Sequence, residues 1–449
     1  MSRILVLGLG RAGTAAARHA LAAGDEVTVY AGLAASNKDA AVVELAKAGA
    51  QVVCGTEDVS GSYDLCVASP GISANSSFYA AGRAHATELV GECEYAFRLS
   101  SQDWIAITGT NGKTTTTALT AHLLNAAGKL AFPCGNIGDT CTASVDHRKP
   151  GETLVAEMSS YGLASTSRFA PKVAALLNIT PDHLAWHGTH EAYAAAKLKI
   201  FANMGAGNTA VICDEVPQAV QLAASLRSRG VRVITVGSDT GDDCAFARAD
   251  GMLCVRIDGT LVELVCTDEL QIKGPHNVAN ALAASACALA YGCDAAGVAA
   301  GLKDFAALEH RIEPVATVDG VGYYNDSKGT NVDATLVALK AFDGHAIILL
   351  AGGRDKGTAL DELVAACDGP VRCVICYGEA GQRFYDAFEQ GNVAHELACG
   401  MRDAFARAVQ LAQPGDVVLL SPACASFDEF NSFEHRGQVF KELVAALQD

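Results

Sequence analysis

The sequence lacks several features that mark common classes of protein. It has no apolar run long enough to span a membrane, and its N-terminal apolar residues give way at once to glycines, unlike a signal peptide. Positive charge is scarce, since 33 Lys and Arg stand against 50 Asp and Glu, a net charge of −17. A basic face for nucleic acid is therefore not expected, and anionic membranes would be repelled. We expect a cytoplasmic protein with no nucleic-acid or membrane partner.

A zinc-site pattern is also missing, although the chain has 16 cysteines. The only CxxC is Cys373-Val-Ile-Cys376, inside an apolar run where a strand would place the two thiols on opposite faces. No second CxxC completes a four-ligand site. We interpret the cysteines as reduced core residues, which is typical of cytosolic proteins.

The 449 residues, half of them hydrophobic, are enough for two or three domains with separate cores. Apolar runs alternate with alanine-rich helical patterns, which is typical of α/β folds. We predict strands over several of these runs, among them residues 153–157, 173–179, 209–213 and 371–377. We predict a Rossmann-like domain over residues 1–99 and a central P-loop ATPase-like domain with a parallel or mixed sheet over 100–307. A second Rossmann-like domain is predicted over 308–449.

The most specific motif is Thr-Gly-Thr-Asn-Gly-Lys-Thr-Thr at residues 108–115, between the apolar run 104–107 and a helical pattern. Strand, glycine loop and helix form the context of a phosphate-binding loop, in which backbone N–H groups and the helix dipole face an anion. Lys113 would add a charge for the outer phosphates and Thr114 a hydroxyl for Mg²⁺. Ile107 replaces the first glycine of the usual pattern, so the loop is a variant. The alternative is a plain strand-to-helix turn.

A second glycine motif, Gly8-Leu-Gly-Arg-Ala-Gly13, matches the dinucleotide fingerprint near the N-terminus. NAD binding would also need an acidic residue ending the second strand, and Tyr30-Ala31 stand there instead. A diphosphate substrate such as a nucleotide-sugar is the better interpretation, because the helix N-terminus can still hold a diphosphate. Tight packing alone would also explain the glycines.

Polar residues follow two apolar strands of the central region. Glu157 ends one strand, at the place where Mg²⁺ is held beside a phosphate loop, and Asp182-His183 follow the next. His183 alone would also fit a surface histidine. Lys197 lies among alanines in a helical pattern, and its residue type and position alone predict an exposed helix lysine.

Further polar residues occupy a helix start and three expected loops. Asn277 and Asn280 are one helical turn apart, suited to an adenine edge or a phosphate, although Asn277 could simply cap the helix. In the third region, polar residues follow apolar runs at the rim where α/β sheets bind ligands, although each loop could be only a turn. These segments are His310-Arg311, 325–331, 352–357 and 421–430.

Taken together, these segments resemble the Mur ligases, the ATP-dependent amide-forming enzymes of peptidoglycan precursor synthesis. The resemblance spans all three predicted domains in order, and residues 421–433 resemble the D-glutamate-adding member in particular. The matching segments are 108–115, 135–138, 157–160, 182–183, 196–198, 276–280, 310–311 and 325–331.

The resemblance implies a reaction and its substrates. ATP would phosphorylate the carboxylate of UDP-N-acetylmuramoyl-L-alanine, and the amine of D-glutamate would attack the acyl phosphate, in a step of cell wall biogenesis on which cell shape and division depend. Another ligase of the family, with a different amino acid, is the alternative. An ATP-binding regulator and an NAD-dependent oxidoreductase fit the motifs less well. We expect a monomer.

The resemblance also assigns roles to single residues. Lys113, Glu157, His183 and Lys197 would carry the chemistry, with Thr114 and Glu157 on one Mg²⁺, and His183 and a carbamylated Lys197 on a second. ATP would contact Gly109, Thr110, Asn111, Gly112, Lys113, Thr114, Thr115, Asn277, Asn280, Arg311 and Asp326. D-Glutamate would contact Lys328, Thr330, Lys356, Ser426 and Phe433. The nucleotide-sugar substrate would contact Thr14, Ser69, Gly71, Asn136 and Ser159.

Two departures from the family pattern affect substrate contacts. Tyr30-Ala31 replace a polar pair that usually ends the second strand, which leaves the uracil contacts open. Gly162 replaces a glutamine that usually follows the Ser-Ser pair, so one substrate contact is in question. Neither departure touches the metal or phosphate groups.

Overall fold

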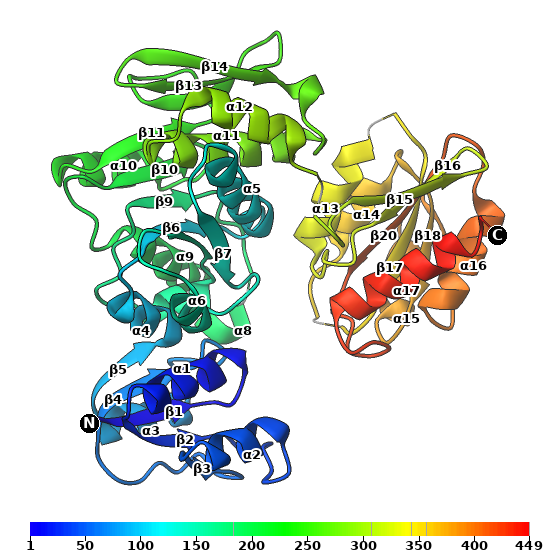
Figure 1. Ribbon diagram of the computed structural model, residues 1–449. Helices are drawn as coiled ribbons and strands as arrows, with labels where there is room; N and C mark the ends of the chain where they lie inside the picture. The colour runs from blue at the N-terminus through cyan, green and yellow to red at the C-terminus, as the bar shows by residue number, and fades with distance from the viewer. Residues whose placement is uncertain (183, 307, 343, 356, 449) are drawn as a thin grey trace. The chain divides into compact units, whose positions relative to one another are not determined.

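The computed structural model describes residues 1–182, 184–306, 308–342, 344–355 and 357–448. It separates into two compact units, residues 1–270 with 278–305, and residues 271–277 with 306–449. The first unit contains two β-sheets and the second contains one, all of the α/β type (Figure 1). The α/β fold is confirmed, while the domain limits at residues 99 and 307 stay a prediction.

The first sheet has five parallel strands in the order β3-β2-β1-β4-β5. Alternate residues of β1 point to opposite faces, so Ile4 and Val6 pack with α1, α2 and α4, while Leu5 and Leu7 pack with α3. The strands are β1 Arg3–Leu7, β2 Glu26–Tyr30, β3 Gln51–Val53, β4 Tyr63–Ala68 and β5 Ala86–Gly91; the helices are α1 Arg11–Ala22, α2 Ala40–Lys47, α3 Ser77–His85 and α4 Glu92–Leu99.

The second sheet has nine strands in the order β14-β13-β12-β11-β10-β9-β6-β8-β7. Strands β6 to β12 are parallel, and β13 and β14 add an antiparallel edge. Because β6 lies between β8 and β9, the carboxyl ends of these three strands meet at one edge. The strands are β6 Asp103–Thr108, β7 Ala131–Gly135, β8 Thr153–Glu157, β9 Val173–Leu176, β10 Thr209–Cys213, β11 Arg232–Val236, β12 Cys244–Ala247, β13 Met252–Ile257 and β14 Thr260–Cys266.

Helices cover the second sheet and connect its strands. Helix α5 follows β6 directly, and α7 follows β8, so both begin at the edge where β6, β8 and β9 end. The helices are α5 Lys113–Ala126, α6 Cys141–His147, α7 Ser160–Ala164, α8 Leu184–His187, α9 His190–Leu198, α10 Ala219–Ser228, α11 Pro275–Ala290 and α12 Ala295–Asp304.

The third sheet has six strands in the order β15-β16-β20-β17-β18-β19, parallel except for the β15–β16 pair. Helices α13, α14 and α15 cover one face, and α16 and α17 cover the other (Figure 1). The strands are β15 Glu313–Val318, β16 Val321–Asn325, β17 Ile347–Gly352, β18 Val371–Tyr377, β19 Ala394–Leu397 and β20 Val417–Ala423; the helices are α13 Val332–Leu339, α14 Asp361–Cys367, α15 Gly381–Phe388, α16 Met401–Leu411 and α17 Phe433–Ala445.

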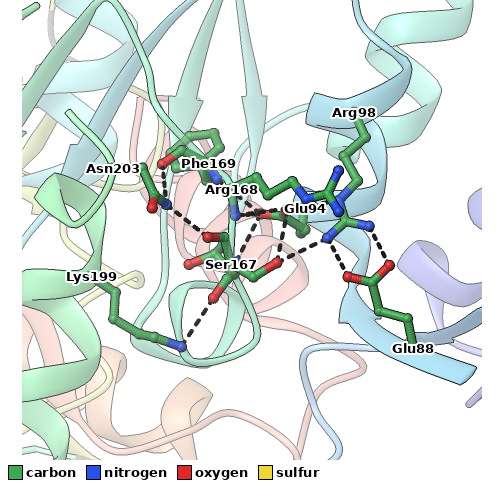
Figure 2. Close-up of polar contacts among 9 residues, drawn as sticks. Glu88, Glu94, Arg98, Ser167, Arg168, Phe169, Lys199 and Asn203 are labelled. Atoms are coloured by element: carbon green, nitrogen blue, oxygen red, sulfur yellow. Dashed lines mark hydrogen bonds and ion pairs between the residues drawn. The ribbon is translucent and has the colours of Figure 1, made fainter. Parts of the chain in front are cut away.

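A buried carboxylate ties α4 to the segment that follows α7. Glu94 is fully buried and accepts hydrogen bonds from the backbone N–H groups of residues 167–169, and Arg98 pairs with it at 2.8 Å (Figure 2). Lys199 and Asn203 donate to backbone carbonyls of the same segment. The segment is therefore held from two sides, and α7 with it.

The cysteines are free thiols, and most are buried. Cys373 and Cys376 belong to the cores on opposite faces of the third sheet, as predicted. Among the helices in the described parts of the chain, none combines the length and the apolar composition that a membrane span needs.

Candidate active site

The segment 108–115 forms the predicted strand, loop and helix. Gly112 has φ 81°, a left-handed conformation that favours glycine, and a Cβ atom there would collide with the side-chain oxygen of Asn280 on α11. At Gly109 a Cβ atom would come within 3.0 Å of Leu177. Both glycines are thus required by close approach of neighbouring elements, which fixes the path of the loop.

Asn178, the second residue after β9, holds this loop in place. Asn178 accepts from the Thr110 N–H through its backbone carbonyl (3.0 Å) and from the Asn111 N–H through its side chain (2.8 Å). Its side-chain amide donates back to the Asn111 carbonyl. These bonds explain why β9 ends at Leu176, three residues before the end predicted for this strand.

Lys113 and the buried threonines line the start of α5. The Lys113 Nζ donates to the carbonyls of Gly109 (2.9 Å) and Thr110 (2.7 Å). Thr114 and Thr115 are 5% and 3% exposed, and Thr116 donates to Asn280 (3.2 Å). The first turn of α5 is thus polar and enclosed, as an anion site at a helix N-terminus requires.

Glu157 ends β8, and only one of its two carboxylate oxygens has a hydrogen-bond partner among the described residues. Its Oε1 accepts from the Asn136 side chain at 2.8 Å, whereas its Oε2 is buried without a hydrogen-bond partner among the described residues. Asn136 also donates its backbone N–H to the Glu157 carbonyl. A buried carboxylate oxygen left without a donor is costly unless a cation or ligand satisfies it.

Lys197 is buried, with 1% exposure, so the exposed position predicted from its sequence context is wrong. Its Nζ donates to the Gly109 carbonyl at 2.6 Å and lies 4.6 Å from the Tyr193 ring centroid. Burial, and then the charge of Lys113, hold the pKa of Lys197 well below its usual range. Helix α9 thus places the Lys197 side chain against the phosphate loop, where the lowered pKa favours its uncharged amine form.

Residues near the first-sheet glycines pack tightly. A Cβ atom at Gly13 would collide with the Gly8 carbonyl, and one at Gly8 would come within 2.9 Å of the Ser69 hydroxyl. Thr14 donates to the Leu9 carbonyl (3.3 Å), and Gly71 is exposed. Tight packing therefore accounts for Gly8 and Gly13, and it leaves the N-terminus of α1 beside Ser69.

Two of the other candidates lie at helix ends, Ser159 at the start of α7 and Asn277 near the start of α11. Ser159 caps α7 by accepting from the Gly162 N–H at 3.1 Å, so its hydroxyl already has a structural partner. Asn277 donates to the Lys273 carbonyl, and Asn280, on the same helix, reaches the phosphate loop. His183 and Lys356 lie outside the described residues.

In the second unit, Asp326 and Arg311 lie at the end of β16. The Asp326 carboxylate accepts from Ser421 Oγ (2.7 Å) and the Ile312 N–H (3.3 Å), and its burial raises its pKa to about 6. His310 and Ile312, on either side of Arg311, have φ values of 63° and 45°. Such left-handed backbone is strained at a β-branched residue and is concentrated at functional sites.

The predicted amino-acid contacts share one rim of the third sheet. Lys328 lies over the Phe433 ring at 5.5 Å and donates its backbone N–H to the His310 carbonyl. Thr330 is two residues further along the same loop, and Ser426 is 2% exposed in the loop after β20. The structure thus gathers Lys328, Phe433, Ser426, Arg311 and Asp326 on loops at the carboxyl ends of β16 and β20.

Several residues of these sites were missed by the sequence interpretation. Asn178 lies four residues before Asp182, but only the structure shows that it holds the phosphate loop. Tyr193, whose hydroxyl contacts Thr110 at 2.9 Å, and the fully buried Arg436 carried no sequence signal beyond their helical positions.

Comparison with known proteins places the chain among close relatives. Residues 107–288 match the family described as Mur ligase middle domain, and residues 310–424 match Mur ligase, glutamate ligase domain. The UDP-N-acetylmuramoylalanine–D-glutamate ligase of Pelotomaculum thermopropionicum is 40% identical, over 99% of this chain and 98% of the relative. The enzyme of the same name from Geobacillus kaustophilus is 36% identical over the same shares of both chains.

Solved structures agree on the fold. The chain matches MurF from Acinetobacter baumannii with a TM-score of 0.62 at 18% identity, over 99% of this chain and 93% of the other. It matches the UDP-N-acetylmuramate-alanine ligase of Thermotoga maritima with a TM-score of 0.59 at 19% identity, over 99% of this chain and all of the other. The chain belongs to the Mur ligase family.

Proposed function

We propose that the protein is an ATP-dependent ligase that adds D-glutamate to UDP-N-acetylmuramoyl-L-alanine in peptidoglycan precursor synthesis. Relatives that carry this activity in their names match nearly the whole chain. The structural observation that supports it most is the meeting of the phosphate loop, Glu157 and Lys197 at one edge of the second sheet. This edge offers donors for phosphates together with a carboxylate for a cation.

The chemistry requires two anions, a carboxylate and a γ-phosphate, to approach each other. Lys113 supplies positive charge at the loop, and the loop N–H groups and the dipole of α5 add to it. The carboxylate oxygen attacks the γ-phosphorus and ADP leaves, giving an acyl phosphate. The amine of D-glutamate then attacks the acyl carbon, loses a proton, and phosphate leaves with the formation of the amide.

The residues fit one Mg²⁺ as they stand. Thr114 offers a hydroxyl and Glu157 an unsatisfied carboxylate oxygen, which are the hard ligands Mg²⁺ uses alongside substrate phosphates. Among the described residues no three His, Cys, Asp or Glu side chains form a metal cluster. A bound Mg²⁺ would neutralise charge that develops on the phosphates.

A second Mg²⁺ would need carbamylation of Lys197 and the participation of His183. An unmodified lysine does not bind a cation, but its neutral amine reacts with CO₂ to give a carbamate anion. Burial beside Lys113 favours that neutral amine, because it lowers the pKa of Lys197. We assign His183 to this site by resemblance alone.

Substrate contacts complete the proposal. Asn136 and Ser159 would face the muramoyl-alanine part, and Thr14, Ser69 and Gly71 the UDP part. Asn277, Asn280, Arg311 and Asp326 would contact ATP, and Lys328, Thr330, Lys356, Ser426 and Phe433 the amino acid, whose carboxylates suit the lysines. We place the protein in the cytoplasm as a monomer, where its free cysteines stay reduced.

Amide formation can be tested with purified protein, ATP, Mg²⁺ and UDP-N-acetylmuramoyl-L-alanine, with product identified by mass. We expect the product only when D-glutamate is supplied. Product with another amino acid would keep the ligase chemistry and change its specificity.

A further inference from the structure

A fully buried arginine in the second unit lies beneath three rim loops. Arg436, on α17, is 0% exposed, and it is among the largest side chains of the chain that are fully buried. Its four hydrogen bonds to described residues go to hydroxyl and carbonyl oxygens, and none goes to a carboxylate. Burying a guanidinium costs several kcal/mol of desolvation unless hydrogen bonds satisfy it, so a buried arginine at this position calls for a structural reason.

The first two loops are joined directly by this side chain. Nε donates to Ser327 Oγ (2.9 Å) and Nη2 to the Ser327 carbonyl (2.8 Å), in the loop after β16. Nη2 and Nη1 donate to the carbonyls of Cys424 (3.1 Å) and Ala425 (3.3 Å), in the loop after β20. Ser327 Oγ in turn donates to the Phe433 carbonyl at the start of α17.

The third loop packs against the same guanidinium. A Cβ atom at Gly353, after β17, would lie 3.1 Å from Arg436 Nη1, so the glycine backbone rests on the planar group. The neighbouring Arg354 N–H also bonds the Ala425 carbonyl at 2.8 Å. Of the candidates for the amino-acid contact, the loop after β16 carries Lys328 and Thr330, and the loop after β20 carries Ser426.

We propose that Arg436 is a positioning residue for the amino-acid substrate. Its planar fork joins the loops after β16 and β20, and the loop after β17 packs against it. This inference rests on the proposed function. A guanidinium spreads donors in fixed directions in one plane, and a lysine ammonium at the same position cannot reach acceptors on both loops at once. Its guanidinium hydrogen-bonds no carboxylate among the described residues, although Asp326 and Glu429 interact with its charge.

The test compares steady-state kinetics of the wild type, Arg436→Lys and Arg436→Gln for each substrate separately. We expect the KM for D-glutamate to rise about tenfold or more in both variants, the equivalent of one lost charge-assisted hydrogen bond. The KM values for ATP and the muramoyl substrate should stay within twofold. Arg407→Lys is the matched control, because Arg407 on α16 pairs with Asp403 and Glu396 at the surface.

A general loss of folding would lower the maximal rate with every substrate alike or abolish expression. A rise in the KM for D-glutamate alone therefore distinguishes positioning from a merely structural role. Ser327→Ala removes one hydrogen-bond acceptor of Arg436 and should destabilise the fold less than the Arg436 variants do. It should raise the KM for D-glutamate about threefold, by loss of one weak hydrogen bond. If the Arg436 variants do not fold, Ser327→Ala tests whether Arg436 positions the D-glutamate site. An unchanged KM for D-glutamate in the folded variants overturns the inference while the function stands. Absence of D-glutamate-dependent turnover in the wild type would overturn the function itself.

Discussion

Lys197 is the residue whose environment departs furthest from its sequence context. Its amine is enclosed beside Lys113 and the Gly109 carbonyl, and the lowered pKa favours the uncharged form that attacks CO₂. We predict that Lys197→Ala loses activity by about 100-fold or more, the size of a lost electrostatic group at a reacting centre. Bicarbonate should stimulate the wild type and leave the variant unchanged.

The carbamate itself can be observed by ¹³C NMR after exposure to labelled bicarbonate. A signal present in the wild type and in Lys303→Ala, an exposed lysine variant, should be missing from Lys197→Ala. Full activity of the alanine variant would remove Lys197 from the mechanism.

Glu157 has one carboxylate oxygen bound by Asn136 and one without a partner among described residues. Glu157→Gln keeps the shape and the acceptor for Asn136 but removes the charge. We predict a loss of about 10²–10³ in kcat with a higher Mg²⁺ requirement, and little change in melting temperature. Magnesium titrations of phosphate release check this, with the exposed Glu191→Gln as control. Wild-type magnesium dependence in Glu157→Gln would contradict the assignment.

The raised pKa of Asp326 should make the free energy of unfolding depend on pH. Its folded pKa is raised to about 6, so its contribution to stability is present below its ordinary pKa near 4 and is lost as the pH rises through 6. Relative to Asp326→Asn, the wild type should lose up to about 3 kcal/mol of unfolding free energy from pH 4 to pH 6.5. Urea unfolding at several pH values measures this, with the exposed Asp386→Asn as control. A pH-independent difference would show that the pKa of Asp326 is not raised.

At the residue scale, the sequence predicted chemistry where residue type and strand position coincide, as at Lys113 and Glu157. It did not predict the burial of Lys197 or of Arg436, because burial of a charged helix residue depends on which neighbouring element covers it. The alanines around Lys197 indicate room for close packing but do not reveal that the phosphate loop occupies that room.

At the scale of elements, buried parallel strands were predicted best. The strands Thr153–Glu157, Thr209–Cys213 and Val371–Tyr377 have the predicted ends, because continuous apolar runs mark strands buried on both faces. Strands β12 to β14, of which β13 and β14 form the antiparallel edge, were not predicted. The end of β9 was placed too late, because Asn178 turns away to bind the phosphate loop.

The contacts of Glu94 with Arg98 and residues 167–169 should stabilise the segment that follows α7. We predict that Glu94→Ala lowers the free energy of unfolding by about 3–5 kcal/mol, because Arg98 and the N–H groups of residues 167–169 lose their buried acceptor (Figure 2). Glu88→Ala, at a side chain 42% exposed, should cost less than about 1 kcal/mol. Urea denaturation compares the two, and equal losses would show that Glu94 is not the anchor.

At the scale of the whole molecule, the proposed roles are divided between the two units. The phosphate loop, Glu157 and Lys197 belong to the first, and Arg311, Asp326, Lys328 and Arg436 to the second. The sequence predicted the α/β class and the order of the motifs, because each motif follows a strand of its own sheet.

The most direct test of the central claim is phosphate release from ATP, Mg²⁺ and UDP-N-acetylmuramoyl-L-alanine, with D-glutamate, L-glutamate, L-alanine or meso-diaminopimelate supplied in parallel. We predict rapid phosphate release and a new amide product with D-glutamate alone. No release with any amino acid, from folded protein that still binds ATP, would contradict it and favour an ATP-binding regulator.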